Sequence, residues 1–307
     1  MVPSVRSPVA CQPVGRRRRA RLARYRAIVT AKRVIFVSDT HLSPDAPEAQ
    51  ENWAAVVRYV AAATPDLVVH LGDLSLDGAR NAADLHHARG QLEMLPVPWT
   101  AVPGNHDIGD NPRPDAPEEL SVTEARRQRW RDVVGADYWS VVIADWTLLA
   151  VNAQLAGSGL AAEASQWSWL EDQLRNAAPG QRIALLAHKP LTATEAELAA
   201  APPYRFWPAA SRERLSHMFA GRPPAVFVSG HVHQSRQLRL DGTSHLWVPT
   251  TWAVLSDIAQ PVLGAKRCGV LSMTFEAGQT PQPQFHEPDG IRQLTQNIDI
   301  PDPYQGR

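Results

Sequence analysis

Short apolar runs recur along the chain, and each of them ends in polar residues. The clearest are VIFVSD (34–39), LVVHLGD (67–73), WTAVPGNHD (99–107), IALLAHKP (183–190) and AVFVSGHVH (225–233). Runs of this length, rich in Val, Ile and Leu, are typical of strands that are buried on both faces. They predict a mostly parallel sheet.

Two segments between these runs have helical spacing of their apolar residues. EAQENWAAVVRYVAAA (48–63) follows the first run and SQWSWLEDQLRNA (165–177) precedes the fourth. Both predict amphipathic helices, the second with Ser165 as its N-cap. Strands that alternate with helices indicate βαβ units, with helices covering the faces of the sheet.

The later part of the chain changes character. SRQLRLDGTSHLWVPT (235–250) has Asp241 and Gly242 between two strand-like runs, which indicates a hairpin, and GVLSMTFE (269–276) predicts a further strand. We expect a second, antiparallel layer beside the first. The Pro- and Ala-rich segments 109–120 and 193–210 predict surface loops, each of which is either a plain connection or the wall of a pocket.

Composition narrows the class of protein. With 307 residues, 44% of them hydrophobic, the chain can bury the core of one large α/β domain or two smaller ones. Its two cysteines, Cys11 and Cys268, cannot form a disulfide framework, and no secretory segment follows the N-terminus. No apolar stretch approaches the ~20 residues that span a bilayer. These features predict a soluble, cytoplasmic protein without a membrane partner.

The zero net charge conceals an uneven distribution of charge. Residues 1–33 contain ten of the 31 Lys and Arg residues and none of the 31 Asp and Glu residues. Such a basic segment could bind nucleic acid, but a disordered, solvated leader is the simpler expectation. We expect three regions, namely a basic leader (1–32), a catalytic domain (33–275) and a tail that wraps the domain (276–307).

The polar residues at the ends of the apolar runs form a chemically coherent set. The carboxyl ends of neighbouring parallel strands meet at one crevice, where ligands bind. Five of the eleven histidines lie at these ends, whereas others, such as His70, His86 and His87, are better interpreted as structural or solvated. Asp-x-His and His-x-His spacings place both side chains on one side of an extended segment. The predicted metal ligands are Asp39, His41, Asp73, Asn105, His188, His231 and His233.

The residue types in this set indicate the kind of metal. Imidazole, carboxylate and amide oxygen suit Mn, Fe or Zn, and the lack of thiolates argues against a closed structural zinc site. Seven ligands are too many for one tetrahedral ion and are suitable for two divalent transition-metal ions that share a carboxylate. Glycines precede Asp73, Asn105 and His231, and we expect them to let the backbone turn sharply as it leaves the sheet.

The ordered set D-x-H, GD, GNHD, H and GHxH over residues 33–275 resembles the calcineurin-like metallophosphoesterase superfamily. The resemblance implies an α/β fold of two packed mixed β-sheets flanked by helices, with a binuclear metal centre at the strand ends. It also implies that Asp73 bridges the two ions. The other implied ligands are Asp39, His41 and His233 for one ion, and Asn105, His188 and His231 for the other.

Within the superfamily, the block GDLSLDG (72–78) differs from the GDxVDRG block of the Ser/Thr protein phosphatases. The stretch 67–78, LVVHLGDLSLDG, resembles the class III cyclic nucleotide phosphodiesterases more closely than it resembles those phosphatases. The match departs after His188, where a second histidine is common and this chain has Lys189. The resemblance leaves the substrate open.

The predicted reaction is hydrolysis of a small phosphodiester, with a cyclic nucleotide as one candidate, by attack of a metal-bridging hydroxide. His106 is then available as a general acid or charge stabiliser at the leaving oxygen, with Asp107 fixing its tautomer. His106 could instead be a turn residue beside a ligand.

The alternative functions are a phosphomonoesterase of the same superfamily, a nuclease recruited by the basic leader, or a scaffold that has lost its metals. A scaffold should show replaced ligands, and this chain shows none. The sequence does not determine the oligomeric state.

Overall fold

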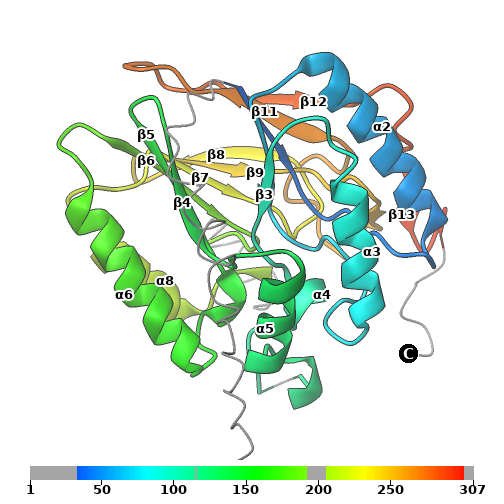
Figure 1. Cartoon of the computed structure of the whole chain (residues 1–307), viewed down its shortest axis with the longest axis horizontal. Coiled ribbons are helices and arrows are strands. Elements are labelled where there is room, and N and C mark those ends of the chain that lie inside the picture. Colours follow the sequence, from blue (N-terminus) through cyan, green and yellow to red (C-terminus); the bar gives the residue numbers. More distant parts are fainter. Residues whose placement is uncertain (1–32, 115, 192–204, 301–307) are drawn as a thin grey trace, which may run out of the picture.

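Two mixed sheets pack face to face in the computed structural model, which describes residues 33–114, 116–191 and 205–300 (Figure 1). The five-stranded sheet contains, in spatial order, β12 (Gln284–His286), β11 (Val270–Thr274), β1 (Arg33–Val37), β2 (Leu67–His70) and β3 (Trp99–Ala101). β1, β2 and β3 are parallel, whereas β11 and β12 run antiparallel to their neighbours.

The six-stranded sheet has four parallel strands at its centre. Its spatial order is β4 (Trp139–Ile143), β5 (Trp146–Val151), β6 (Arg182–Ala187), β7 (Val226–Ser229), β9 (Thr243–Trp247) and β8 (Arg236–Leu240). β5, β6, β7 and β9 are parallel, and β4 and β8 are antiparallel edge strands. β10 (Val254–Leu255) and β13 (Thr295–Gln296) form a small separate pair.

This arrangement confirms the fold of two packed mixed sheets and corrects the expectation of one parallel sheet with a separate antiparallel layer. The five apolar runs are divided, with β1, β2 and β3 in one sheet and β6 and β7 in the other. Both sheets are covered on both faces, so the strands of either have the same apolar composition. An apolar run therefore does not indicate the sheet to which its strand belongs.

The alternation of side chains along each strand builds the layers. In β1, Val34 and Phe36 belong to the core between the sheets, together with Leu148 of β5. Ile35 and Val37 point the other way, toward the helices on the outer face. Successive residues of a strand face opposite sides, so one short run contributes to two hydrophobic cores.

Helices cover the outer face of each sheet (Figure 1). α2 (Pro47–Ala63) and α3 (Ala82–Leu92) cover the five-stranded sheet, while α6 (Ala161–Asn176) and α8 (Ala209–Met218) cover the other. The described residues also contain the helical segments α4 (Asn105–Ile108), α5 (Glu124–Val133), η2 (Glu118–Leu120) and η3 (Ala153–Leu155).

The two predicted helices are present, but the predicted cap of the second is wrong. α6 begins at Ala161 with Leu160 at its N-cap, and Ser165 lies inside the helix, where its hydroxyl donates to the carbonyl of Ala161 at 3.0 Å. A serine inside a helix can satisfy its hydroxyl in this way, so its presence alone does not mark a helix start.

The predicted hairpin is confirmed, because β8 and β9 pair antiparallel around Asp241 and Gly242. Both turn residues have positive φ, 47° and 82°, as a two-residue hairpin turn requires. β8 extends the six-stranded sheet, and β11 of the predicted strand 269–276 extends the other.

Residues 276–300 of the expected tail add β12 and β13 and bury Leu294 and Ile300. The expected leader, residues 1–32, and most of the predicted loop 193–210 lie outside the described residues. Within the described part of the chain, no helix is long and apolar enough to cross a membrane.

Candidate metal centre

The predicted ligands meet at the carboxyl ends of strands from both sheets. Asp39 and His41 follow β1, Asp73 follows β2, and Asn105 begins α4 after β3. His188 follows β6, and His231 and His233 follow β7. Because the two sheets end at the same side of the molecule, one crevice collects ligands from both.

Several ligands converge through a strained backbone rather than an extended one. Left-handed φ values occur at Asp39 (53°), His41 (46°), Asp73 (54°), His231 (69°) and His233 (51°). Non-glycine residues rarely adopt such values, which cost free energy and gather at functional sites. This corrects the expectation that Asp-x-His and His-x-His act as extended segments, since each ligand sits at its own tight bend of the chain.

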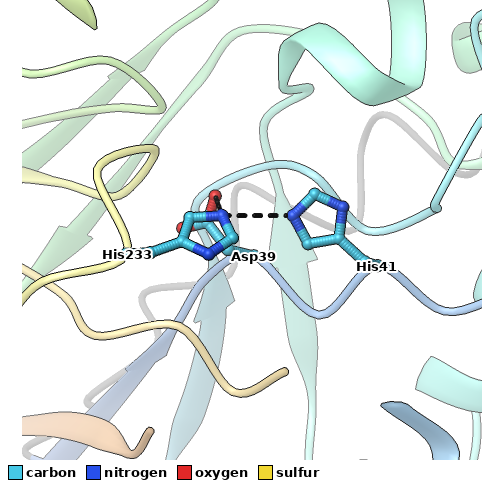
Figure 2. A group of neighbouring side chains, drawn as sticks. All are labelled: Asp39, His41 and His233. Carbon is cyan, nitrogen blue, oxygen red and sulfur yellow. Dashed lines mark hydrogen bonds and ion pairs between the residues drawn. The ribbon is translucent and has the colours of Figure 1, made fainter. Parts of the chain in front are cut away.

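The first ligand group consists of Asp39, His41 and His233 (Figure 2). Nε2 of His41 lies 3.3 Å from Nε2 of His233, and Nε2 of His233 lies 3.4 Å from Oδ1 of Asp39. All three residues are buried. Figure 2 shows the two imidazole rings turning their nitrogens toward one another beside the carboxylate.

The second group is centred on His188. Its Nε2 lies 3.2 Å from Oδ2 of Asp73, 3.1 Å from Nδ1 of His231 and 3.2 Å from Oδ1 of Asn105. Ligand atoms that lie ~2.0–2.2 Å from one ion are separated from each other by roughly 3–3.6 Å. The spacing in both groups has this size.

Asp73 lies between the two groups. Its Oδ2 lies 3.2 Å from Nε2 of His188 and 3.9 Å from Nε2 of His41, while its Oδ1 accepts a hydrogen bond from the amide of His106 at 2.8 Å. One oxygen is therefore fixed by the backbone and the other points to both groups, which is the placement expected of a bridging carboxylate.

The hydrogen bonds of the histidines show that the donor set fits a cation. Nδ1 of His188 lies 2.8 Å from the carbonyl of Leu71, and Nδ1 of His233 lies 2.6 Å from that of Ala253. A carbonyl only accepts, so these Nδ1 atoms carry the protons and, in neutral rings, leave Nε2 with a lone pair. Backbone carbonyls orient metal-binding histidines in this manner. The lone pairs face other acceptors, an arrangement that a cation stabilises.

The pKa shifts indicate the same need for positive charge. Although burial opposes a charged ring, the carboxylates of Asp73 and Asp39 raise the pKa of His188 to about 9. Burial, together with the neighbouring histidines, holds the pKa of His41 and of His231 well below the usual range. Near neutral pH, a proton can therefore supply the positive charge at His188 but not at His41 or His231.

Two of the three glycines before ligands provide space rather than a turn. Gly72 has a φ of 102°, as expected for a sharp turn, whereas Gly104 has an ordinary φ of −104°. A Cβ atom on Gly104 would lie 2.1 Å from Oδ1 of Asp73, and one on Gly230 would lie 1.8 Å from Oγ of Ser38. Only glycine allows these close approaches.

The segment GNHD forms a helical turn, α4, and not an extended strand end. Asn105 and His106 therefore do not project to opposite sides, yet they do face different groups. Oδ1 of Asn105 contacts His188, whereas Nε2 of His106 lies 3.9 Å from Oδ2 of Asp73 and Nδ1 lies 2.9 Å from the carbonyl of Leu76. By geometry, His106 also forms a candidate ligand group with His41 and Asp73.

The expectation that Asp107 fixes the His106 tautomer is corrected by its hydrogen bonds. Its buried carboxylate accepts from the amides of Leu74, Ser75 and Gly104 and from the hydroxyl of Ser75, at 2.7–3.2 Å. Asp107 thereby joins α4 to the loop after β2, and the carbonyl of Leu76 is the partner that orients His106. Burial and the charge of Asp73 raise the pKa of Asp107 to about 6.

Sequence reasoning missed a buried ion pair beside this centre. The side chain of Lys189 is fully buried, and its ammonium contacts Oδ1 of Asp110 and, at 2.9 Å, Oδ1 of Asn111. Lysine directly after a ligand at a buried strand end was the only signal in the sequence. Its partners lie in a loop 79 and 78 residues earlier.

The family model for calcineurin-like phosphoesterases matches residues 32–235, and the chain belongs to this family. It is 28% identical over 134 residues to a probable cyclic nucleotide phosphodiesterase of Moraxella catarrhalis, covering 40% of this chain and 45% of that protein. It is 28% identical over 171 residues to the probable glycerophosphodiester phosphodiesterase GpdQ of Arcobacter nitrofigilis, covering 51% and 56%. The chain thus matches about half the length of these two curated relatives.

Among solved structures, the purple acid phosphatase PPD1 from yellow lupin seeds has a similar fold. The TM-score is 0.61 at 16% sequence identity, and the match covers 86% of this chain and 52% of that one.

Proposed function

We propose that this protein is a phosphodiesterase that uses two divalent transition-metal ions, Mn, Fe or Zn, and acts on a small phosphodiester. The position of Asp73 between two ligand groups is the observation that carries the proposal. Family membership and the phosphodiesterase names of two relatives support it.

The proposed ligands fall into two sets, and the distances between them support this division. Asp39, His41 and His233 would hold one ion, Asn105, His188 and His231 the other, and Asp73 would bridge them. Ions bound here would supply a nucleophile at neutral pH and neutralise charge on the phosphate.

The protein's own contribution beyond these ligands is to place a proton. The side chain of His106 is 24% exposed at the edge of the centre, and its Nδ1 donates to the carbonyl of Leu76. The ring is thus held with Nε2 toward the substrate, where it can protonate a leaving oxygen as a general acid.

Metal reconstitution with a substrate panel tests the proposal. We expect about two metal ions per chain after loading with Mn, hydrolysis of bis(4-nitrophenyl) phosphate, and loss of this activity in chelator. Asp73→Asn should lose metal and activity together, whereas Asp172→Asn, at an exposed position of α6, should not.

Two results would contradict the proposal. Protein without bound metal whose activity is unchanged in chelator would exclude the binuclear mechanism. Turnover of 4-nitrophenyl phosphate with no turnover of diesters would indicate a phosphomonoesterase instead.

A further inference from the structure

A cleft of about 330 Å³ lies beside the candidate metal centre. Asn105 and His106 line its inner end, so a substrate at the metal centre would extend into it. Residues of the segment between α4 and α5 also line it, and its charged lining residues are Arg80, Arg113 and Arg126 together with Asp77, Asp110 and Glu119. Among these groups, Asp77 is paired with Arg80 and Asp110 with Lys189, whereas the side chain of Arg126 donates its hydrogen bonds to neutral groups.

Arg126 is held in place by neutral groups. Nη1 and Nη2 of Arg126 donate to the main-chain carbonyls of Ser121 and Glu119 at 2.6 and 2.8 Å. Behind it, Nη1 of Arg129 donates to the carbonyl of Gly78 at 3.0 Å. Carbonyls fix the orientation of a guanidinium without neutralising its charge.

The charges of these arginines disfavour one another. Burial and the positive charges of Arg129 and Arg80 lower the pKa of Arg126, which means that its charged form is destabilised in this setting. Arg80 is compensated by Asp77 at 2.9 Å. An anion in the cleft would offset the remaining repulsion and replace the water that a buried charge loses.

Hydrogen bonds fix the base of the segment that lines the cleft. The amide of Asp110 donates to the carbonyl of Leu120, and the amide of Val122 donates to the carbonyl of Asp110, both at 2.7 Å, which closes the loop at its base. The buried ammonium of Lys189 holds Asp110 and Asn111 from behind. Fixing the base of the loop lowers the entropic cost of ordering it when a ligand binds.

We propose that this cleft binds a second anionic group of the substrate, a phosphate separate from the one that is hydrolysed. The inference rests on the proposed function and narrows its substrate class to phosphodiesters that also carry a terminal phosphate, such as a phosphorylated dinucleotide. Arg126 is the principal contact, with Arg80 and Arg113 beside it.

Binding of three dinucleotides to the full-length, Mn-loaded protein tests this inference by calorimetry, which does not require turnover. Thymidylyl-thymidine is compared with the same molecule carrying a terminal 5′-phosphate or 3′-phosphate. We expect at least one phosphorylated form to bind tenfold or more tightly than the unphosphorylated one. Arg126→Gln should reduce this preference below threefold, and Arg126→Lys should retain part of it.

Two further variants secure the interpretation. Arg239→Gln removes the same charge from the exposed strand β8 and should keep the full preference. Arg113→Gln tests the cleft independently if thermal melting shows that Arg126→Gln is unfolded, and it should also reduce the preference.

Equal affinities for all three dinucleotides in the wild-type protein would overturn the inference. A preference that survives in Arg126→Gln would also overturn it, because the terminal phosphate would then be binding the metal ions. Failure of the proposed function is a separate result, namely no hydrolysis of bis(4-nitrophenyl) phosphate by the same metal-loaded protein.

Discussion

Nδ1 of His106 lies 2.9 Å from the carbonyl oxygen of Leu76, a contact that fixes the imidazole ring at the border between the metal centre and the cleft. Because a carbonyl only accepts, Nδ1 carries a proton, and Nε2 is the nitrogen that can exchange one with a substrate. The ring is thus positioned to act on the leaving group.

We predict that His106→Ala leaves two metal ions bound and lowers kcat by ~10²- to 10⁴-fold for a diester with a poor leaving group, as expected when a general acid is lost. The loss should be smaller for bis(4-nitrophenyl) phosphate, since nitrophenolate leaves without protonation. Metal content and kcat are measured side by side. Asn105→Ala is the matched comparison and should lose metal. If His106→Ala loses metal equally, His106 is a ligand, as its proximity to His41 and Asp73 also allows.

Gly104→Ala should impair metal binding through a single added methyl group. The new Cβ would lie 2.1 Å from Oδ1 of Asp73, so the proposed bridging carboxylate must move. Elemental analysis should show less than the full metal content. Gly90→Ala in α3 is the control, since a Cβ there meets nothing within 4 Å and alanine in a helix stabilises by about 0.5–1 kcal/mol. Full metal content in Gly104→Ala would show that Asp73 does not need its present position.

Lys189→Met should lower the free energy of unfolding. The substitution removes the cation and leaves the carboxylate of Asp110 partly buried without it, a change that typically costs about 3–5 kcal/mol. Urea unfolding measures the effect. The double variant Lys189→Met/Asp110→Asn removes both charges and should recover part of the loss. If the double variant loses as much unfolding free energy as the two single variants together, or more, the ion pair is not the source of the effect.

Acid should destabilise the protein partly through His245 on β9. Burial lowers its pKa from 6.5 to about 4, so the unfolded chain binds the proton more readily than the folded protein. The resulting loss of stability begins as the pH falls below 6.5, grows down to pH 4 and amounts to about 3 kcal/mol. His245→Asn cannot take up this proton.

Unfolding free energies at pH 7 and pH 5 check this prediction. The decrease between the two pH values should be smaller in His245→Asn than in the wild-type protein, while His86→Asn on the exposed surface of α3 should match the wild type. The metal ligands are common to all three proteins, so their titration cancels in the comparison. An equal decrease in all three would show that His245 does not contribute.

The sequence by itself determined the strands that end at the centre, the helices α2 and α6, and the identity of the residues that meet there, whereas β4, β5, α3 and α8 were not predicted. Apolar runs such as 34–37 become strands because burial on both faces requires continuous hydrophobicity. The polar residues at their ends are exceptional in such surroundings, so His188 or Asp73 could be singled out without a structure. These signals are local in the chain, and a local pattern is sufficient to detect them.

Only the tertiary structure decided how these pieces are arranged. It divided the strands between two sheets and placed the carboxylate of Asp107 in a hydrogen bond with Ser75 rather than with His106. In the same way, it placed Lys189 in contact with Asp110, which lies 79 residues earlier in the sequence. It also showed that left-handed bends at residues such as Asp39 and His233, and not strand pleating, aim the ligands. Contacts of this kind depend on which distant segments pack together, and no short stretch of sequence contains that information.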